Sequence, residues 1–313
     1  MSIQSVLVGT AKTEIPAGMR STSQAMNRRD FLTSSALTAA LAAAQSRGAP
    51  APRGQAGTAA SSRGGMHIDR EKCVACGNCI AVCPMGAIYV DPAIKRSTIN
   101  YDECVECSTC LRNMSIVCPV AAFSLEDVAW PRSVRREFSN PRNGHPSTGV
   151  TGRGTEEVKT NDVTNRIKVG EAGCVIEFGR PGVGARFRDI QKVTMALAQV
   201  HVQFEKENPL TFLIADQSTG ILRPEVLNEK VMSAIAETKT RIERVPEVLD
   251  AVERVSREIA TVLAVAVSTR CDEDGEEKVL SALLEEHGYS RKRAKTNLGL
   301  GRATNTGMKG DRA

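Results

Sequence analysis

Eight of the ten cysteines in this 313-residue chain lie between positions 73 and 118, and they form two sets of four. The first set has the spacing C-x2-C-x2-C-x3-C followed by proline, and it consists of Cys73, Cys76, Cys79 and Cys83. The second set has the spacing C-x2-C-x2-C-x7-C, again followed by proline, and it consists of Cys104, Cys107, Cys110 and Cys118. A segment this rich in thiols is expected to fold around whatever those thiols bind.

This spacing favours an iron–sulfur cluster over other uses of cysteine. Three thiolates two residues apart, on a loop that winds around a metal, reach three corners of one cluster. The fourth thiolate comes from elsewhere in the chain, where a proline ends the local turn. Zinc sites instead use pairs of C-x2-C with a longer spacer, and disulfides between cysteines this close would be strained.

Residues 66–127 resemble the bacterial-type ferredoxins that carry two [4Fe–4S] clusters. In that family the fourth cysteine of each set ligates the cluster of the other set. The resemblance therefore implies one cluster held by Cys73, Cys76, Cys79 and Cys118. It implies a second cluster held by Cys104, Cys107, Cys110 and Cys83. Because the last spacing differs between the sets, x3 against x7, the cluster environments differ, and we expect two distinct potentials.

The N-terminal segment resembles a twin-arginine export signal. Arg28 and Arg29 precede a short apolar stretch at 33–44, and the small residues 49–51 suit a signal peptidase. We interpret residues 1–51 as a signal peptide with its n-region, cleaved after position 51, and we expect a periplasmic protein. The alternative is a stray arginine pair before an alanine-rich helix. The twin-arginine route carries folded proteins with cofactors inserted, which reconciles export with eight reduced thiols.

The segments around the cysteine sets differ in composition. Residues 52–65 are predicted to be a flexible linker. The polar segment 128–170 is predicted either to be disordered or to wrap the ferredoxin module or a partner, with Trp130 as an anchor. Residues 272–313 hold an acidic loop, a short helix and a basic tail, which we interpret as a solvated end rather than a binding arm.

Residues 171–271 alternate between strand and helix patterns. Strands are expected at 175–178, 201–204, 210–215, 240–244 and 261–268. Helices are expected at 190–200, 226–235 and 248–255. This order is similar to the ferredoxin-like α/β plait, a fold that need hold no cluster. The chain is thus predicted to be an α+β protein that joins a small two-cluster ferredoxin module to an α/β-plait C-terminal domain.

One loop in this C-terminal region is a candidate anion site. Its glycines Gly182 and Gly184 follow an expected strand and precede a helix, with three arginines nearby. Exposed N–H groups at a helix start favour a small anion. A tight strand-to-helix turn explains the glycines equally well, and the loop has neither dinucleotide-binding nor P-loop spacing.

Charge and hydropathy exclude several classes of protein. The net charge of +5 comes from the two chain ends, and the body is mildly acidic and poor in aromatics, so nucleic-acid binding is not expected. No apolar run is long enough for a transmembrane helix. The module itself is acidic, which suits docking of a basic redox partner, although a solvated surface explains the charge as well.

The leading hypothesis is a non-catalytic electron-transfer protein or subunit. Two clusters would pass single electrons to or from a partner oxidoreductase. One alternative is an oxidoreductase with its own substrate site in the C-terminal domain, and another is a redox- or ligand-sensing protein. No catalytic residue is assigned, because no nucleophile–base pair or flavin or nicotinamide motif is visible. Cys174, outside both cysteine sets, is predicted to be a core residue.

Overall fold

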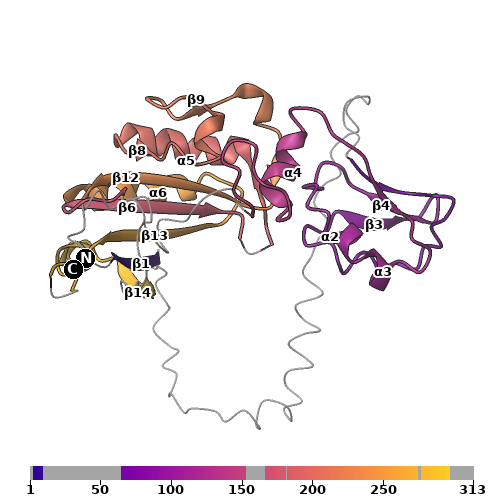
Figure 1. Cartoon of the computed structure of the whole chain (residues 1–313), viewed down its shortest axis with the longest axis horizontal. Helices are drawn as coiled ribbons and strands as arrows, with labels where there is room; N and C mark the ends of the chain where they lie inside the picture. Colours follow the sequence, from indigo (N-terminus) through magenta and orange to yellow (C-terminus); the bar gives the residue numbers. More distant parts are fainter. Residues whose placement is uncertain (1–2, 10–64, 153–165, 181, 274–275, 297–313) are drawn as a thin grey trace, which may run out of the picture. The chain divides into compact units, whose positions relative to one another are not determined.

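The computed structural model describes residues 3–9, 65–152, 166–180, 182–273 and 276–296 (Figure 1). The predicted twin-arginine motif, the cleavage site, the linker up to residue 64 and residues 153–165 of the polar segment lie outside these ranges. The described residues mix helices and strands, which confirms the α+β class. None of the described helices has the length and hydropathy needed to cross a membrane.

The cysteine-rich module is closed by two small antiparallel strand pairs. The strand β3 (Ile88–Asp91) forms a hairpin with β4 (Arg96–Ile99). The strand β2 (Met66–Ile68) pairs with β5 (Phe123–Leu125), which comes from the other end of the module. Two short helices connect the second cysteine set, namely α2 (Thr109–Arg112) and α3 (Met114–Val117). Only the β3–β4 pair is a hairpin, because β2 and β5 come from opposite ends of the module.

The C-terminal domain contains a six-stranded sheet with the order β14-β1-β13-β6-β12-β8. The central strand β6 (Glu171–Phe178) pairs antiparallel with both β12 (Ala234–Arg241) and β13 (Leu263–Arg270). The short strand β8 (Gln203–Phe204) pairs with β12. At the opposite edge, β1 (Ile3–Gly9) lies between β13 and β14 (Ser290–Thr296). Residues 3–9, assigned above to the n-region, and 291–295, assigned to a solvated tail, thus form strands.

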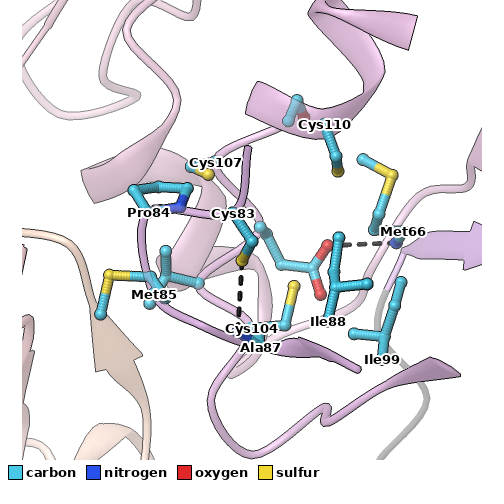
Figure 2. A pocket seen from close by; sticks show the side chains of 13 residues that line it. Met66, Cys83, Pro84, Met85, Ala87, Ile88, Ile99, Cys104, Cys107 and Cys110 are labelled. Atoms are coloured by element: carbon cyan, nitrogen blue, oxygen red, sulfur yellow. Dashed lines mark hydrogen bonds between the residues drawn. The ribbon is translucent and has the colours of Figure 1, made fainter. Parts of the chain in front are cut away.

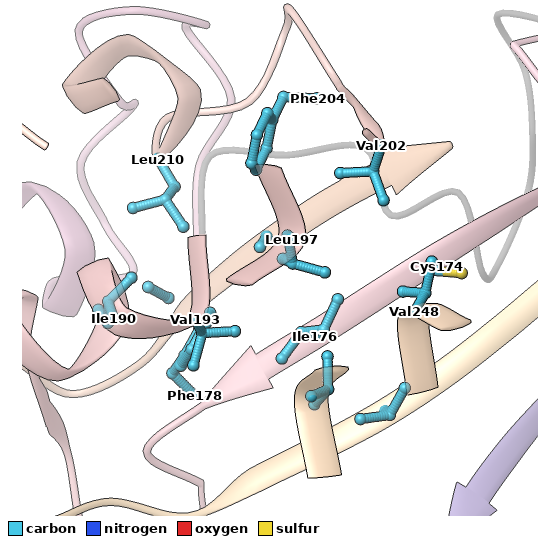
Figure 3. Close-up of a cluster of buried hydrophobic side chains, with 14 of the residues drawn as sticks. Cys174, Ile176, Phe178, Ile190, Val193, Leu197, Val202, Phe204, Leu210 and Val248 are labelled. Carbon is cyan, nitrogen blue, oxygen red and sulfur yellow. The ribbon is translucent and has the colours of Figure 1, made fainter. Parts of the chain in front are cut away.

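One face of this sheet is covered by two amphipathic helices, α5 (Phe187–Gln199) and α6 (Val245–Ser256). Alternate residues of β6 face them, because side chains in a strand alternate between the two faces. The resulting core holds Cys174, Ile176 and Phe178 against Ile190, Val193 and Leu197 (Figure 3). Cys174 is fully buried there, which confirms its prediction as a core residue. Pro246, in the first turn of α6, suits a helix start.

The helix expected at 226–235 is absent. A short 3-10 helix, η3 (Pro224–Val226), is followed by β11 (Lys230–Val231), and β12 begins at Ala234. The apolar residues 226–235 recur at a spacing that fits a helix, but residues 234–241 form an eight-residue strand whose side chains point alternately to the two faces of the sheet. Burial on both faces of the sheet decided for the strand. β11 pairs with β7 (Ala185–Arg186).

The remaining elements are short. The expected strand at 210–215 divides into a 3-10 helix η2 (Thr211–Leu213) and β9 (Ile214–Asp216), which pairs with β10 (Ile221–Leu222). The expected strand at 240–244 is the end of β12 followed by η4 (Ile242–Arg244). The polar segment contains α4 (Ser133–Ser139), and the short C-terminal helix is α7 (Val279–Glu286).

Candidate metal centre

The two C-x2-C-x2-C loops have the same backbone conformation. Ala75 and Glu106, each placed just before the middle cysteine, have φ of 57° and 55°. Gly77 and Ser108, each just after it, have φ of 76° and 58°. Left-handed residues on both sides of the middle cysteine curl each loop tightly. The internal repeat of the sequence is therefore also a repeat of geometry.

The last cysteine of each set is likewise repeated in its surroundings. Ala87 donates its backbone N–H to Sγ of Cys83 across 3.2 Å, and Ala122 donates to Sγ of Cys118 across the same distance. In each case the residue before the alanine has a positive φ, which turns the N–H back toward the sulfur. Hydrogen bonds of this kind stabilise a ligating thiolate and shift a cluster's potential.

Cysteines from both sets line one small cavity, of about 20 Å³ (Figure 2). Its thiols are Cys83, Cys104, Cys107 and Cys110, the four that the ferredoxin resemblance assigns to a single cluster. Met66, Ile88 and Ile99 supply an apolar wall. Throughout the described ranges, no three His, Cys, Asp or Glu side chains converge closely enough to hold one ion. Thiols arranged around a space, rather than at a point, fit a polynuclear iron–sulfur group.

Burial shapes the chemistry of these thiols. Burial raises the pKa of Cys110 to about 12. Burial, followed by the negative charge of Glu106, raises the pKa of Cys104 to about 12. Because the thiolate is the form that binds metal, a bound metal must displace these protons.

The first cysteine set is arranged differently. Sγ of Cys79 donates to Oγ of Ser97 across 3.5 Å, and burial raises the pKa of Cys79. Burial also opposes ionisation of Cys73, but hydrogen bonds from Ala75 and Ser97 outweigh it and lower the pKa of Cys73. Ser97 thus lies beside both thiols, whereas Cys76 is exposed. For both sets the assignment of cluster ligands stays a prediction.

A buried carboxylate, not anticipated from the sequence, lies within the second cysteine loop. Glu106 has no exposed surface. Its Oε1 accepts from Nε and Nη2 of Arg132 across 3.1 and 2.8 Å, and its Oε2 accepts from the backbone N–H of Met66 across 3.2 Å. One difference between the two loops in the sequence indicates this feature: the residue equivalent to Glu106 in the first loop is the small, uncharged Ala75.

Helix α4 from the polar segment contributes a second buried cation. Arg135 is 4% exposed. Its Nη1 donates to the carbonyls of Tyr101, Asp102 and Cys104 across 3.0, 3.0 and 2.8 Å, while its Nε donates to Glu229. Helix α4 thus contacts the second cysteine loop, and the wrapping role of residues 128–170 as a whole stays a prediction.

Trp130, predicted as an anchor for that segment, is not buried. Its side chain is 40% exposed, and the guanidinium of Arg223 lies over its ring at 4.7 Å from the centroid. This is a cation–π contact at the surface. The anchoring contacts of the segment come instead from its buried arginines.

Acidic residues at the start of the second cysteine loop pair with cations of the C-terminal domain. Nη2 of Arg186 lies 2.6 Å from Oδ2 of Asp102 and 3.1 Å from Oε1 of Glu103. Lys230 also pairs with Glu103. These carboxylates belong to the acidic surface that was predicted to suit a basic partner, and here the chain itself supplies the positive charge.

Four backbone N–H groups of the glycine loop and of the start of α5 already donate hydrogen bonds within the chain. The N–H groups of Val183 and Gly184 both donate to the carbonyl of Gly179, across 3.1 and 2.9 Å. At the start of α5, the N–H groups of Phe187 and Arg188 donate to the carbonyls of residues 229 and 227. A Cβ on Gly184 would lie 2.9 Å from the carbonyl oxygen of residue 231. These contacts favour the tight-turn interpretation over anion binding at Gly182 and Gly184.

Comparison with known proteins identifies the cysteine-rich module. Residues 65–119 match the family described as 4Fe-4S dicluster domain. The chain is 39% identical over 59 residues to pyruvate synthase subunit PorD of Methanothermobacter marburgensis, covering 19% of this chain and 62% of that protein. It is 35% identical over 66 residues to a ferredoxin of Pyrobaculum islandicum, covering 21% of this chain and 57% of the relative.

A third relative is NAD(P)H-quinone oxidoreductase subunit I of Gloeobacter violaceus, 28% identical over 74 residues, or 21% of this chain and 34% of that protein. This chain thus spans about three-fifths of the length of the first relatives it matches. No solved structure matches the chain. Residues 65–119 form a ferredoxin-type domain of the 4Fe-4S dicluster family.

Proposed function

We propose that this chain is an exported electron-transfer protein, or the electron-transfer subunit of an oxidoreductase, with two [4Fe–4S] clusters. The observation that carries the proposal is the cavity lined by Cys83, Cys104, Cys107 and Cys110. A cysteine of the first set lies with three of the second there, and this arrangement supports the crossed ligation typical of two-cluster ferredoxins. By the repeat, Cys118 would join Cys73, Cys76 and Cys79.

The clusters, when bound, supply one-electron chemistry that no side chain offers. The chain's own residues hold and shield them. The apolar wall of Ile88 and Ile99 excludes water from the second site. The N–H groups of Ala87 and Ala122 stabilise charge on the sulfurs they meet. Buried Glu106, paired with Arg132, places a fixed pair of charges beside one site only. These differences support two unequal potentials.

The names of the relatives support a protein partner. Two of them are subunits, of a pyruvate synthase and of an NAD(P)H-quinone oxidoreductase, and a third is a ferredoxin. We infer that this chain likewise exchanges electrons with a separate oxidoreductase, and that it is a component of the system rather than its catalyst.

We further propose that the C-terminal domain is a ferredoxin-like α/β plait. Four of its strands lie in the order β13-β6-β12-β8. Along the chain they are joined as β6, α5, β8, β12, α6 and β13, and both helices pack on one face. This strand order and connection pattern support the plait, with β1 and β14 added at one edge.

An oxidoreductase with its own substrate site stays the second candidate function. A cavity of about 270 Å³ in the C-terminal domain could hold such a substrate. Its charged lining is largely paired, because Nε of Arg166 lies 3.1 Å from Oε2 of Glu205 and Nζ of Lys239 lies 3.2 Å from Oε2 of Glu171. Turnover of a small substrate by the isolated protein would favour this candidate.

The experiment that tests the proposed function is metal analysis with low-temperature EPR on anaerobically purified protein, before and after reduction with dithionite. We expect iron and sulfide in equal amounts, and a reduced spectrum with a separate signal from each of two [4Fe–4S] clusters. Zinc in place of iron, or no EPR signal from a protein that retains iron, would contradict the proposal.

A further inference from the structure

The repeat provides an internal comparison between the two cysteine loops. Their backbones turn alike, yet two of the equivalent side chains, at the residue after the first cysteine and at the middle cysteine, are exposed in loop one and buried in loop two. Val74, the residue after the first cysteine of loop one, is 58% exposed, whereas its equivalent Val105 is 1% exposed. Cys76 is exposed, whereas its equivalent Cys107 is 8% exposed. What differs is the cover over each loop, because the local conformation is shared.

The cover of the second loop comes from the rest of the same chain. Arg135 caps three carbonyls between residues 101 and 104, and Arg132 pairs with Glu106. From the C-terminal domain, Arg186 and Lys230 pair with the carboxylates at 102 and 103. Four cations therefore hold the second loop against elements that follow the module. A partner protein would have to displace these contacts to reach it.

The first loop has a different surface chemistry. No charged residue lies between Cys73 and Cys83. Besides Val74, Ile80 is exposed, at 40% of its surface. Neither has polar groups to satisfy, and burying them against another protein removes apolar surface from water. A surface of this kind selects a partner that is apolar and uncharged at the point of contact.

We propose that the first cysteine loop, and not the second, is where this chain meets its redox partner protein, and that the partner presents an uncharged, apolar face there. This inference rests on the proposed electron-transfer function and deepens it by locating the surface that binds the redox partner. Val74 and Ile80 form the contact, and Cys76 is the ligand nearest the partner. The acidic surface of the module does not guide this docking, so the association depends little on salt.

The first test uses a dysprosium chelate as a soluble relaxation agent on the reduced holoprotein. The agent shortens the electron-spin relaxation of whichever cluster lies nearer to solvent. The Cys76→Ser variant identifies the EPR signal of the first-loop cluster, and Cys107→Ser identifies the other. We expect the signal altered by Cys76→Ser to relax several-fold faster with the agent. Equal relaxation of both signals, or faster relaxation of the second, overturns the inference.

The second test examines docking with a photoreactive benzoylphenylalanine placed at position 74. The control is position 94, because Ile94 is 40% exposed, as Ile80 is, and lies in the same module between β3 and β4. In cells producing the protein, position 74 should crosslink to a redox protein, and position 94 should not. Electron exchange between the purified pair should slow several-fold in Val74→Ser and Ile80→Ser, and be unchanged in Ile94→Ser and at raised salt.

These outcomes separate the two proposals. Variants that lose their EPR signals are excluded by measuring iron, and Val74→Ser and Ile80→Ser, at different positions of the loop, give two independent readings. A wild-type protein without cluster signals refutes the electron-transfer function itself. Normal signals with crosslinking at position 94 alone, or exchange that falls steeply with salt, refute only the assignment of the first loop.

Discussion

Nη2 of Arg132 lies 2.8 Å from Oε1 of Glu106, and the glutamate side chain has no exposed surface. Removing one partner of such a pair leaves an uncompensated buried charge, which costs about 3–5 kcal/mol. We therefore expect Arg132→Met to lower the free energy of unfolding by about that amount, measured by urea denaturation under anaerobic conditions.

An exposed ion pair provides the control for this measurement. Arg257 lies 2.9 Å from Glu253 with its side chain 74% exposed, so Arg257→Met should change stability by less than about 1 kcal/mol. The double variant Arg132→Met with Glu106→Gln should recover most of the loss, because it removes both charges. Equal effects of Arg132→Met and Arg257→Met would show that the buried pair does not stabilise the fold.

Crossed ligation makes a specific prediction for cysteine variants. Cys83→Ser should perturb the same EPR signal as Cys107→Ser, and Cys118→Ser should perturb the signal of Cys76→Ser. Each should lower the iron content by up to about half, from roughly eight atoms per chain. Cys174→Ser, in the core of the C-terminal domain, should leave both signals unchanged. If Cys83→Ser altered the same signal as Cys76→Ser, each set would instead hold its own cluster.

His145 predicts how stability depends on pH. Burial lowers the pKa of His145 from 6.5 to about 4. Below pH 6.5 the unfolded chain takes up a proton on this histidine that the folded chain does not. The free energy of unfolding is therefore highest above pH 6.5 and declines as the pH falls toward 4. We expect a decline of up to about 3 kcal/mol from this residue, measured as urea midpoints across this range.

Two variants isolate the contribution of His145. His145→Asn, which keeps a polar group near Oγ of Ser147, at 2.8 Å from Nδ1 in the native protein, should flatten the decline. His287→Asn, at an exposed position, should leave the decline as it is. An unchanged slope in His145→Asn would place the acid sensitivity elsewhere.

Export is predicted to shorten the chain. If the twin-arginine interpretation holds, protein recovered from the periplasm begins at residue 52, and its intact mass is that of residues 52–313. Replacing Arg28 and Arg29 with lysine should retain full-length protein in the cytoplasm. A periplasmic fraction without the protein, or a full-length mass there, would contradict the interpretation.

The sequence predicted the repeat of the two cysteine loops better than it predicted the segments that surround them. The two sets share their cysteine spacing and their Cys-Pro steps, and their backbone turns occur at equivalent residues. Local sequence was therefore sufficient to predict the repeat. The cavity, by contrast, joins Cys83 to residues of the second set across a distance that only the ferredoxin resemblance implied. The contacts of Arg135 with the loop at 101–104 join segments about thirty residues apart, and no spacing rule indicates such a pairing.

The C-terminal domain shows where periodicity is insufficient. Helices α5 and α6 were predicted because each buries one face only. The strand β12 was mistaken for part of a helix because Ala234 and Ile235, adjacent in sequence, are both buried, on opposite faces of a sheet. A pattern that reports burial cannot distinguish two buried faces of a strand from one wide face of a helix. The neighbours β6 and β8 resolve the choice, and they are distant in sequence.

The position of β1 has a consequence for a chain that is cut. β14 adjoins only β1 in the sheet order, and β1 in turn adjoins β13. A peptidase acting after residue 51 would remove the strand between them, leaving β14 with its arginines and lysines detached and the backbone groups of β13 unpaired. An unpaired edge recruits another strand. The precursor and the processed chain would then have C-terminal sheets with different edge strands. Cleavage would change what the C-terminal domain can bind as well as where the protein resides.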